Sequence, residues 1–488
     1  MKYKKIGLIA CAVILAAAFI GPTIGTAESN RVHQHQEEQE AEACTHGDEV
    51  FCTHLPLVMI DTGGVEIPGK MFYDEETGST EIQMAEDGSK VILSEIRIID
   101  QEEKNNHMED AAEIESLAEI RVRGNSSRFF DKNNYRIHFV DEEGVNRDVE
   151  VMGMSAHHEW ALHGPILDKT LIRNYMWYNI AGEIMDWAPN VRFCEVILNG
   201  EYKGLYVMME TITDGGDEGR LDIEDTVKGM TASGYVLRLD RGSSVAVKNI
   251  ETFTQSAGRN QGSLNIEFPN TGDLTEEVIR AIEQDFSDFE KALYSYDYDT
   301  DDYGYWNYID VGSWVDYFII NEFTCNYDAG SISTYIYKDI SGKYKTCIWD
   351  FNSACDNYQE AGISREGFRL QYGVWYFMLM KDEYFCERII SRYQELRETW
   401  LNEDYLLGYI DSVIAYLGDA VERNNEVWGY TYEEEYNMLS PEERNPHSYE
   451  EAVEDMKEFI VERGAWMDQY IEILLQYSHE SKVKKYNH

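Results

Sequence analysis

Two acidic residues, Asp328 and Asp350, lie at opposite ends of one predicted β-hairpin, and this arrangement constrains the fold more than any other feature of the sequence. Residues 332–337 and 344–349 are rich in β-forming side chains, and the stretch between them contains turn residues, including Gly342. An antiparallel hairpin brings its two open ends together. We therefore expect the carboxylates of Asp328 and Asp350 to be neighbours in space.

The chemistry of these residues is that of a site for a hard cation. Carboxylate and amide oxygens are the ligands that Mg²⁺ prefers, and Asn352 follows closely after Asp350. We predict that Asp350 and Asn352 are metal ligands and that Asp328 is the catalytic residue, which orients a substrate hydroxyl. Two structural roles stay open: Asp350 as a buried carboxylate between Trp349 and Phe351, and Asp328 as a turn residue after a helix.

The chain is strongly acidic and long enough for a large packed core. Its 488 residues are 43% hydrophobic and include 91 acidic and 42 basic side chains, for a formal net charge of −49. Nucleic-acid binding needs a basic surface, so we expect no nucleic-acid partner. Opposite charges favour association, so the charge is compatible with a protein substrate that is basic and Ser-rich. It is equally compatible with a role in solubility alone.

The first residues have the pattern of a secretory signal peptide. Lys2, Lys4 and Lys5 precede an apolar run, and small residues lead to a cleavage position after Ala27. We therefore predict a signal peptide at 1–27 and a secreted or cell-surface protein. No other run of the sequence is long and apolar enough to span a membrane, so we expect no membrane span in the mature chain.

Residues 28–54 are predicted to form a polar, solvated linker that carries a repeated Cys-Thr-His pair. A disulfide between Cys44 and Cys52 is one interpretation of the pair, and export to an oxidising compartment favours it. The other interpretation is a zinc site in which His46 and His54 complete a Cys₂His₂ set of ligands.

The rest of the chain divides into a small leading β-rich unit at 55–115, a main domain at 116–478 and a polar tail at 479–488. Strand patterns dominate the first part of the main domain and helical patterns the second, which predicts an α+β fold. The dipeptide Asn199-Gly200 predicts a tight hairpin. Capping residues predict the starts of helices, the first of about sixteen residues, at Asp168, Asp310 and Ser448.

A series of short motifs runs through the chain in a fixed order. They are Arg123–Ser127 with Lys132 and Tyr135–Ile137, Asp168–Thr170 with Arg173 and Asn174, Leu198–Tyr206 with Glu210, Asn321 with Glu322, Asp328, and Trp349–Phe351. In this order they resemble the motifs of the spore coat protein H (CotH) kinase family, over roughly residues 55–475. The sequence departs from the family pattern at Asp356, where a glycine is usual.

The resemblance implies an atypical protein-kinase-like fold with two lobes, in which the N-terminal part is rich in strands and the C-terminal part is mainly helical. It implies ATP and Mg²⁺ as cofactors. Backbone N–H groups of a Gly-, Asn- and Ser-rich loop suit phosphate oxygens. The residues that we expect to contact the nucleotide are Gly124, Ser126, Ser127, Lys132, Arg136 and Glu210. Which cation meets the phosphates stays open among Lys132, Arg136 and Lys169.

The function that the resemblance implies is that of an exported, Mg-dependent atypical protein kinase. Such an enzyme transfers the γ-phosphoryl group of ATP to Ser or Thr of a protein substrate. The alternative is a catalytically inactive CotH-like surface module that binds a host protein or a cell-wall glycan. The 34 tyrosines and 10 tryptophans of the chain suit such a binding surface.

Overall fold

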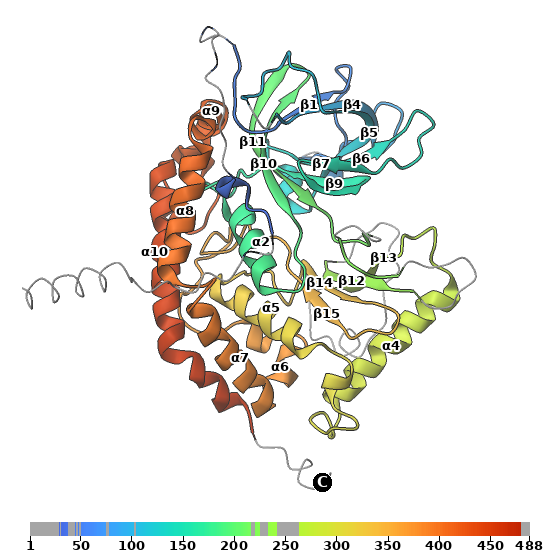
Figure 1. Ribbon diagram of the computed structural model, residues 1–488, viewed down its shortest axis with the longest axis vertical. Helices are drawn as coiled ribbons and strands as arrows, with labels where there is room; N and C mark the ends of the chain where they lie inside the picture. The colour runs from blue at the N-terminus through green and yellow to red at the C-terminus, as the bar shows by residue number, and fades with distance from the viewer. Residues whose placement is uncertain are drawn as a thin grey trace, which may run out of the picture.

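The computed structural model describes residues 29, 31–37, 44, 47, 50–74, 78–101, 104–215, 220–224, 233–241 and 263–479. The predicted signal peptide at 1–27 lies outside the described residues, as do residues 480–488 of the predicted tail. Figure 1 shows the barrel strands in the upper part of the molecule, a second group of strands below them, and most of the helices along the left and lower sides. The α+β class, with strands first and helices later, is confirmed. Among the described residues, none of the helices has the length and apolar character needed to cross a bilayer.

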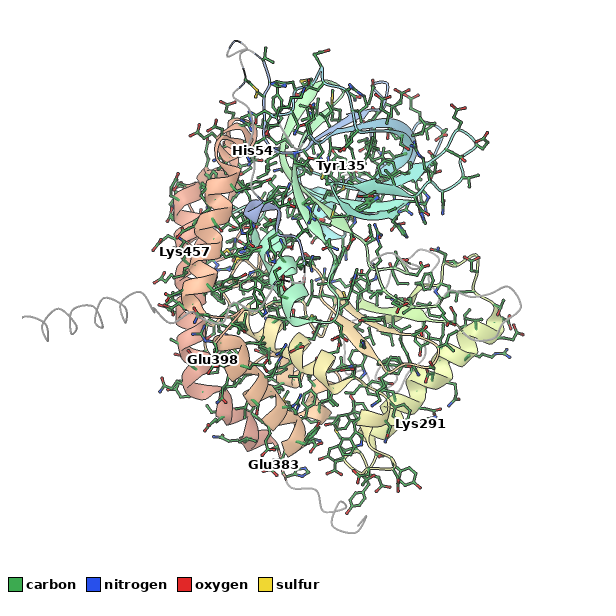
Figure 2. All side chains as sticks on the ribbon, viewed as in Figure 1. His54, Tyr135, Lys291, Glu383, Glu398 and Lys457 are labelled. Carbon is green, nitrogen blue, oxygen red and sulfur yellow. The ribbon has the colours of Figure 1, made fainter. Side chains whose placement is uncertain are left out.

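The N-terminal part is a closed β-barrel whose strands run in the order β1-β10-β11-β9-β6-β5-β4. Its interior is filled by alternate residues of the strands, such as Ile120 and Val122, or Tyr135, Ile137 and Phe139. Figure 2 labels Tyr135 within the barrel. The strands are β1 (Leu57–Asp61), β4 (Ile92–Ile99), β5 (Ile114–Arg123), β6 (Asn134–Val140), β9 (Glu159–His163), β10 (Val191–Leu198) and β11 (Glu201–Glu210).

The barrel corrects the prediction of a separate leading β unit at 55–115. Strand β1 pairs in parallel with β10 and antiparallel with β4, and β4 pairs with β5. The boundary expected near residue 116 therefore falls inside β5, within the barrel. Two short hairpins interrupt the series of barrel strands along the chain. Strands β2 (Met71–Asp74) and β3 (Ser79–Ile82) form the first, and β7 (Val149–Val151) and β8 (Met154–His157) form the second.

The hairpin predicted at Asn199-Gly200 is present as β10 and β11. The two strands pair antiparallel along their full length, from Val191 opposite Met209 to Leu198 opposite Glu201. Both turn residues have positive φ, 51° at Asn199 and 79° at Gly200. Two successive residues with positive φ are the requirement of the tight turns that join twisted antiparallel strands.

A second, four-stranded antiparallel sheet lies below the barrel in Figure 1 and contains the hairpin with which the sequence analysis began. Strands β14 and β15 pair through Tyr335 opposite Cys347 and Tyr337 opposite Lys345, so the predicted hairpin is confirmed. Helix α4 (Glu276–Tyr294) covers this sheet, with the rings of Phe286 and Tyr344 5.3 Å apart. The strand order is β13 (Ser263–Phe268), β12 (Tyr235–Asp240), β14 (Thr334–Lys338) and β15 (Lys345–Cys347).

Helices fill the C-terminal part, and one helix, α2, lies between the barrel and this helical part (Figure 1). The predicted caps at Asp310 and Ser448 are confirmed, since their side chains accept N–H bonds from Ser313 and Glu451. The helices are α2 (Arg173–Ile184), α5 (Val311–Phe323), α6 (Tyr376–Leu379), α7 (Glu383–Arg397), α8 (Glu403–Leu417), α9 (Asp419–Trp428) and α10 (Tyr449–Tyr470).

Helix α2 is shorter than predicted. It has 12 residues and begins at Arg173, after Ile172, so Asp168 is not its N-cap residue. Asp168 nevertheless serves the helix start, because its Oδ2 accepts the N–H of Arg173 at 2.8 Å. The loop from 168 to 172 thus replaces the first helical turn that the sequence pattern indicated.

The segment at 31–37, which we name the N-terminal strap, is packed into the fold, contrary to the solvated linker predicted there. Gln34 is buried and exchanges two bonds with the backbone of Phe193, Nε2 to the carbonyl at 3.1 Å and the N–H to Oε1 at 2.7 Å. His33 is buried as well, with Nε2 2.9 Å from the Glu183 carboxylate on α2. Composition indicated solvation, but the side chains of His33 and Gln34 have buried hydrogen-bond partners.

Candidate functional site

Asp350 follows strand β15 on a backbone that α2 holds in place. Its φ is +59°, in the left-handed region, and its N–H donates to the Tyr178 hydroxyl at 3.0 Å. The next N–H, that of Phe351, donates to the Asn174 side-chain oxygen at 2.9 Å. Tyr178 and Asn174, one helical turn apart on α2, therefore hold the backbone from which the Asp350 side chain projects. A non-glycine residue with a positive φ is strained, and such strain is typical of functional positions.

Asn352 orients the Asp350 carboxylate. Its Nδ2 donates to Asp350 Oδ1, and its Oδ1 accepts from Asn174 Nδ2 at 3.0 Å. The predicted metal ligand Asn352 is thus placed directly beside Asp350. Its amide oxygen already accepts one bond and has a second lone pair for a cation.

A buried ion pair braces the loop that follows. Arg173 pairs with Asp168 and also donates from Nε to the carbonyl of Ala354 at 2.9 Å, and from Nη2 to that of Cys355 at 3.3 Å. The motif residues Asp168 and Arg173 therefore act on the shape of the segment after Asp350. Their contacts in this structure are structural.

Asp328 is half-buried on the turn after α5. Its carbonyl accepts the N–H groups of Ser331 at 3.0 Å and Ile332 at 2.9 Å, and Gly330 completes the turn with a φ of +77°. Burial, and then the negative charge of Asp350, raise the pKa of Asp328 from 3.8 to about 7. The hairpin thus brings the two carboxylates close enough to interact, as the sequence predicted.

Sequence reasoning missed a third carboxylate, Asp240, at the end of β12. Its charge raises the pKa of both Asp328 and Asp350, after the larger effect of burial. Because β12 pairs with β14, with Leu239 opposite Thr334, the end of β12 lies beside the start of the hairpin. An acidic residue directly after a predicted strand was the available signal.

Two cations near the carboxylates were also missed. The guanidinium of Arg123, the last residue of β5, lies 5.3 Å from the Trp349 ring and lowers the pKa of Asp350, against the dominant effect of burial. The charge of Arg241, directly after β12, likewise lowers the pKa of Asp328, against the larger effect of burial. Arg123 opens the motif of the Gly-Asn-Ser loop, so its place in that motif was the signal.

The Gly-Asn-Ser loop turns sharply as it leaves β5. Gly124 has a φ of +115°, and a Cβ atom there would lie 2.0 Å from Ser127 Oγ, so only glycine fits. Ser126 and Ser127 then begin a short 3₁₀ helix, Ser126–Phe129. The predicted phosphate-contacting residues Gly124, Ser126 and Ser127 thus follow directly on the Arg123 side chain that approaches Trp349.

Lys132, the predicted phosphate cation, is buried in the protein and held by other partners. Its Nζ donates to Asn424 on α9 at 2.7 Å and lies over the rings of Tyr206 and Trp428. Burial lowers its pKa strongly. A phosphate would reach this ammonium only if α9 moved, which corrects the expectation for Lys132.

The other two predicted nucleotide contacts are likewise committed to internal partners. Arg136 pairs with Glu159 on the neighbouring strand of the barrel. Glu210 is buried, and its Oε2 accepts the backbone N–H of Asn190 at 2.7 Å and the Asn190 side-chain amide at 3.1 Å. Both residues therefore support the barrel in this structure.

The carboxylates of Asp240, Asp328 and Asp350 are suitable ligands for a hard cation, although their oxygen atoms are not clustered closely around one point. Among the described residues, the group of three ligand atoms that lie within 4.8 Å of one another belongs to Cys44, Cys52 and His107, and the aspartates form no such group of three. Burial raises the pKa of both Asp328 and Asp350; the charge of Asp350 raises the pKa of Asp328 further, and the charge of Asp240 raises both. A divalent cation relieves that repulsion, so Mg²⁺ suits this donor set.

A cavity of about 300 Å³ lies beside Asp328. The neighbours of Asp328 in sequence, Tyr327 and Ala329, both line it, together with Arg369. The Arg369 guanidinium lies 3.8 Å from the Tyr327 ring, and that ring stacks on Tyr358 at 3.7 Å. The cavity thus has aromatic and cationic walls on one side of the candidate catalytic residue.

The predicted Cys44–Cys52 disulfide is not formed. Both residues are free thiols, with their sulfur atoms 3.8 Å apart. Of the two histidines expected in a zinc site, His46 lies outside the described residues, and His54 packs its ring against Tyr416 at 5.0 Å, beside α9 (Figure 2). The histidine that does approach the two thiols is His107, from the loop between β4 and β5.

Residues 120–467 match a family model described as CotH kinase protein. The match covers more than half of the chain and includes α2, the β14–β15 hairpin, Asp240, Asp328 and Asp350. No curated protein matches the chain.

Proposed function

The chain belongs to the CotH kinase family, and from this premise we propose that it is an exported, Mg-dependent atypical protein kinase. It would transfer the γ-phosphoryl group of ATP to Ser or Thr of a protein substrate. The observation that carries the proposal is the interaction of two carboxylates, Asp328 and Asp350, at the open end of one hairpin. The barrel and the helical part would act as the two lobes of a kinase-like fold.

Each carboxylate has a distinct task in this proposal. Asp350, with Asn352 beside it and Asp240 nearby, would hold Mg²⁺, which neutralises phosphate charge when it is bound. Asp328 would orient the substrate hydroxyl. As the hydroxyl oxygen bonds to the γ-phosphorus and the bond to ADP breaks, Asp328 would accept the hydroxyl proton. A pKa of about 7 makes Asp328 basic enough for this transfer.

The nucleotide would lie against the end of β5. Backbone N–H groups of Gly124, Ser126 and Ser127 suit phosphate oxygens, and the charge of Arg123 lowers the pKa of Asp350. The structure thus favours Arg123 over the buried Lys132 as the phosphate cation.

The protein substrate would approach from the side of the cavity next to Asp328. That cavity would receive a side chain of the segment that carries the acceptor hydroxyl. The net charge of −49 favours an approaching segment that is basic and Ser-rich.

The test is radiolabel transfer from ATP to a basic, Ser-rich peptide or to the protein itself. Wild type should transfer label, and Asp350→Ala should reduce the rate by at least about 100-fold. The matched control is Asp339→Ala, in the turn at the far end of the same hairpin, where Asp339 Oδ1 accepts a backbone N–H from Glu224. Equal, low incorporation in all three proteins would contradict the proposal.

A second function, an inactive surface module that binds a host protein or a cell-wall glycan, rests on two departures. Lys132 is buried under α9, and Asp356 is tied into an ion pair with Arg444 at 3.0 Å. A thermal shift separates the two functions, since ligand at a hundred times its dissociation constant adds about 2.7 kcal/mol. A shift with ATP and Mg²⁺ favours the kinase; no shift, with retention on peptidoglycan or host cells, favours the module.

A further inference from the structure

Two thiols and one imidazole converge at the edge of the barrel, away from the aspartates. One ligand atom from each of Cys44, Cys52 and His107 lies within 4.8 Å of the others. All of these residues are half-buried. They come from distant parts of the chain, since Cys44 and Cys52 precede β1, and His107 lies in the loop between β4 and β5.

The spacing of the two sulfur atoms is that of ligands on one zinc ion. A tetrahedral ion with Zn–S bonds of about 2.3 Å places two sulfur ligands about 3.8 Å apart. The Sγ atoms of Cys44 and Cys52 are 3.8 Å apart. A disulfide requires about 2.05 Å, so the pair is spaced for an ion and not for a covalent bond.

Two further polar side chains form hydrogen bonds with Cys52 and His107. Asn105 Nδ2 donates to Cys52 Sγ at 3.2 Å, an interaction that stabilises a thiolate. His107 Nδ1 lies 3.0 Å from Asp110 Oδ2, which directs the Nδ1 proton to the carboxylate and leaves Nε2 as the ligating atom. Carboxylates and amides in these positions are the usual outer contacts of metal ligands.

The backbone fixes the two loops that supply Cys52 and His107. Thr53 and Asn106, the neighbours of these residues in sequence, exchange backbone N–H bonds of 3.1 and 2.7 Å. The Asn106 side chain also donates to the carbonyl of Leu55 at 2.9 Å. The ligands are thus held on a preformed bridge, so little ordering is needed when an ion binds.

We propose that Cys44, Cys52 and His107 bind a structural Zn²⁺ ion that joins the segment before β1 to the β4–β5 loop. Two thiolates with their sulfur atoms in tetrahedral spacing, together with one imidazole within 4.8 Å of them, select zinc over hard cations. Binding releases the two thiol protons, and water completes the coordination. The site lies outside residues 120–467, so it is a property of this chain beyond the proposed kinase function.

The first experiment measures metal content. The full chain is reduced, incubated with ZnCl₂, passed through a desalting column and analysed for zinc by mass spectrometry. We expect about one zinc per chain, with both thiols protected from alkylation until a chelator is added. Cobalt in place of zinc should give the intense visible bands of tetrahedral coordination and the thiolate charge-transfer band.

Variants identify the ligands. Cys52→Ser and His107→Gln should lose the bound zinc and the cobalt bands, while Asp110→Asn should weaken zinc affinity about 10- to 100-fold. The matched control is His54→Gln, which should keep both signals because His54 packs against Tyr416. Circular dichroism of the zinc-free variants monitors their folding.

Two results would overturn the proposal. One is a reduced wild-type protein that keeps no zinc and gives no cobalt bands. The other is loss of zinc in His54→Gln with retention in His107→Gln, which would assign the site to the Cys-Thr-His pairs alone.

Discussion

Burial and the neighbouring charge of Asp350 raise the pKa of Asp328 to about 7. Two residues that the β14–β15 hairpin brings together therefore share one electrostatic environment. Near neutral pH, Asp328 exists in both protonation states, whereas an ordinary aspartate is fully ionised. This interaction gives the candidate site properties that solution experiments can measure.

The first prediction is a pH dependence of phosphoryl transfer. Asp328 accepts a proton only when it is ionised, so kcat/KM should rise about tenfold per pH unit below about 7 and level off above it. The measurement is a pH profile of label transfer at a Mg²⁺ concentration well below saturation, because bound Mg²⁺ relieves the repulsion that raises the pKa of Asp328. A flat profile between pH 5 and 8 would exclude Asp328 as the base.

The second prediction concerns stability and has the opposite sign to activity. The pKa of Asp328 is about 7 in the folded protein against an ordinary 3.8, so the folded state binds more protons than the unfolded state between these values. The free energy of unfolding therefore falls as pH rises through this window. Asp328→Asn stays neutral, so it should be more stable than wild type at pH 8, by about 1–2 kcal/mol.

Urea unfolding of Asp328→Asn and wild type at pH 4 and pH 8 provides the measurement. The difference should be present at pH 8 and small at pH 4, while transfer activity falls at least about 100-fold. Asp339→Asn, in the hairpin turn, is the control and should change neither quantity. A destabilised Asp328→Asn at pH 8 would contradict the assignment.

The third prediction concerns the brace behind Asp350. Arg173→Ala leaves Asp168 buried and unpaired and removes the bonds to Ala354 and Cys355, so it should cost about 3–5 kcal/mol. Arg173→Lys should recover little, because an ammonium does not reproduce the forked guanidinium. Urea unfolding measures both. Arg280→Ala, which loses only an exposed pair with Glu276, should change stability by under about 0.5 kcal/mol.

The fourth prediction uses two glutamines of the N-terminal strap. Gln34 exchanges two bonds with the Phe193 backbone, and Gln34→Ala leaves those buried groups without partners, at a cost of about 1–3 kcal/mol. Gln36, two positions on, is exposed, so Gln36→Ala should be nearly neutral. Thermal unfolding compares the two proteins. Equal melting temperatures would show that the strap is not bound in solution.

The fifth prediction tests Arg123 as the cation of the site. Arg123→Gln removes the charge that lowers the pKa of Asp350, so Mg²⁺ must compete with a more tightly held proton. We expect transfer to fall at least about tenfold and the Mg²⁺ requirement to rise. Arg97→Gln, on β4, removes a barrel arginine paired with Glu115 and should leave both unchanged. Identical effects of the two variants would show that the loss of any positive charge reduces transfer, and would contradict a specific role of Arg123.

Local signals in the sequence were sufficient for the parts of the fold that are close in the chain. The Asn199-Gly200 turn and the β14–β15 hairpin follow from neighbouring residues, and so do the caps at Asp310 and Ser448. The parallel pairing of β1 with β10 joins segments that are distant in the chain, and a local sequence pattern does not predict such a pairing.

The same limit applies to the candidate site. Asp328 and Asp350 were found because one hairpin joins them, whereas Asp240 reaches them only through the pairing of β12 with β14. Lys132 is of a residue type that binds phosphate, but its ammonium donates a hydrogen bond to Asn424, 292 positions away. Burial of a charged side chain by a distant helix is a property of tertiary packing, which residue type does not report.

The barrel also shows that sequence similarity and folding have different boundaries in this protein. The family match starts at residue 120, inside β5, and leaves out β1 and β4. A fragment trimmed to the match would open the barrel and expose the edges of β5 and β10 that those strands cover. Unpaired edges template association with other chains. The part of the chain that matches the family model thus depends on β1 and β4 to close its barrel, and aggregation of a shortened protein would say nothing about its chemistry.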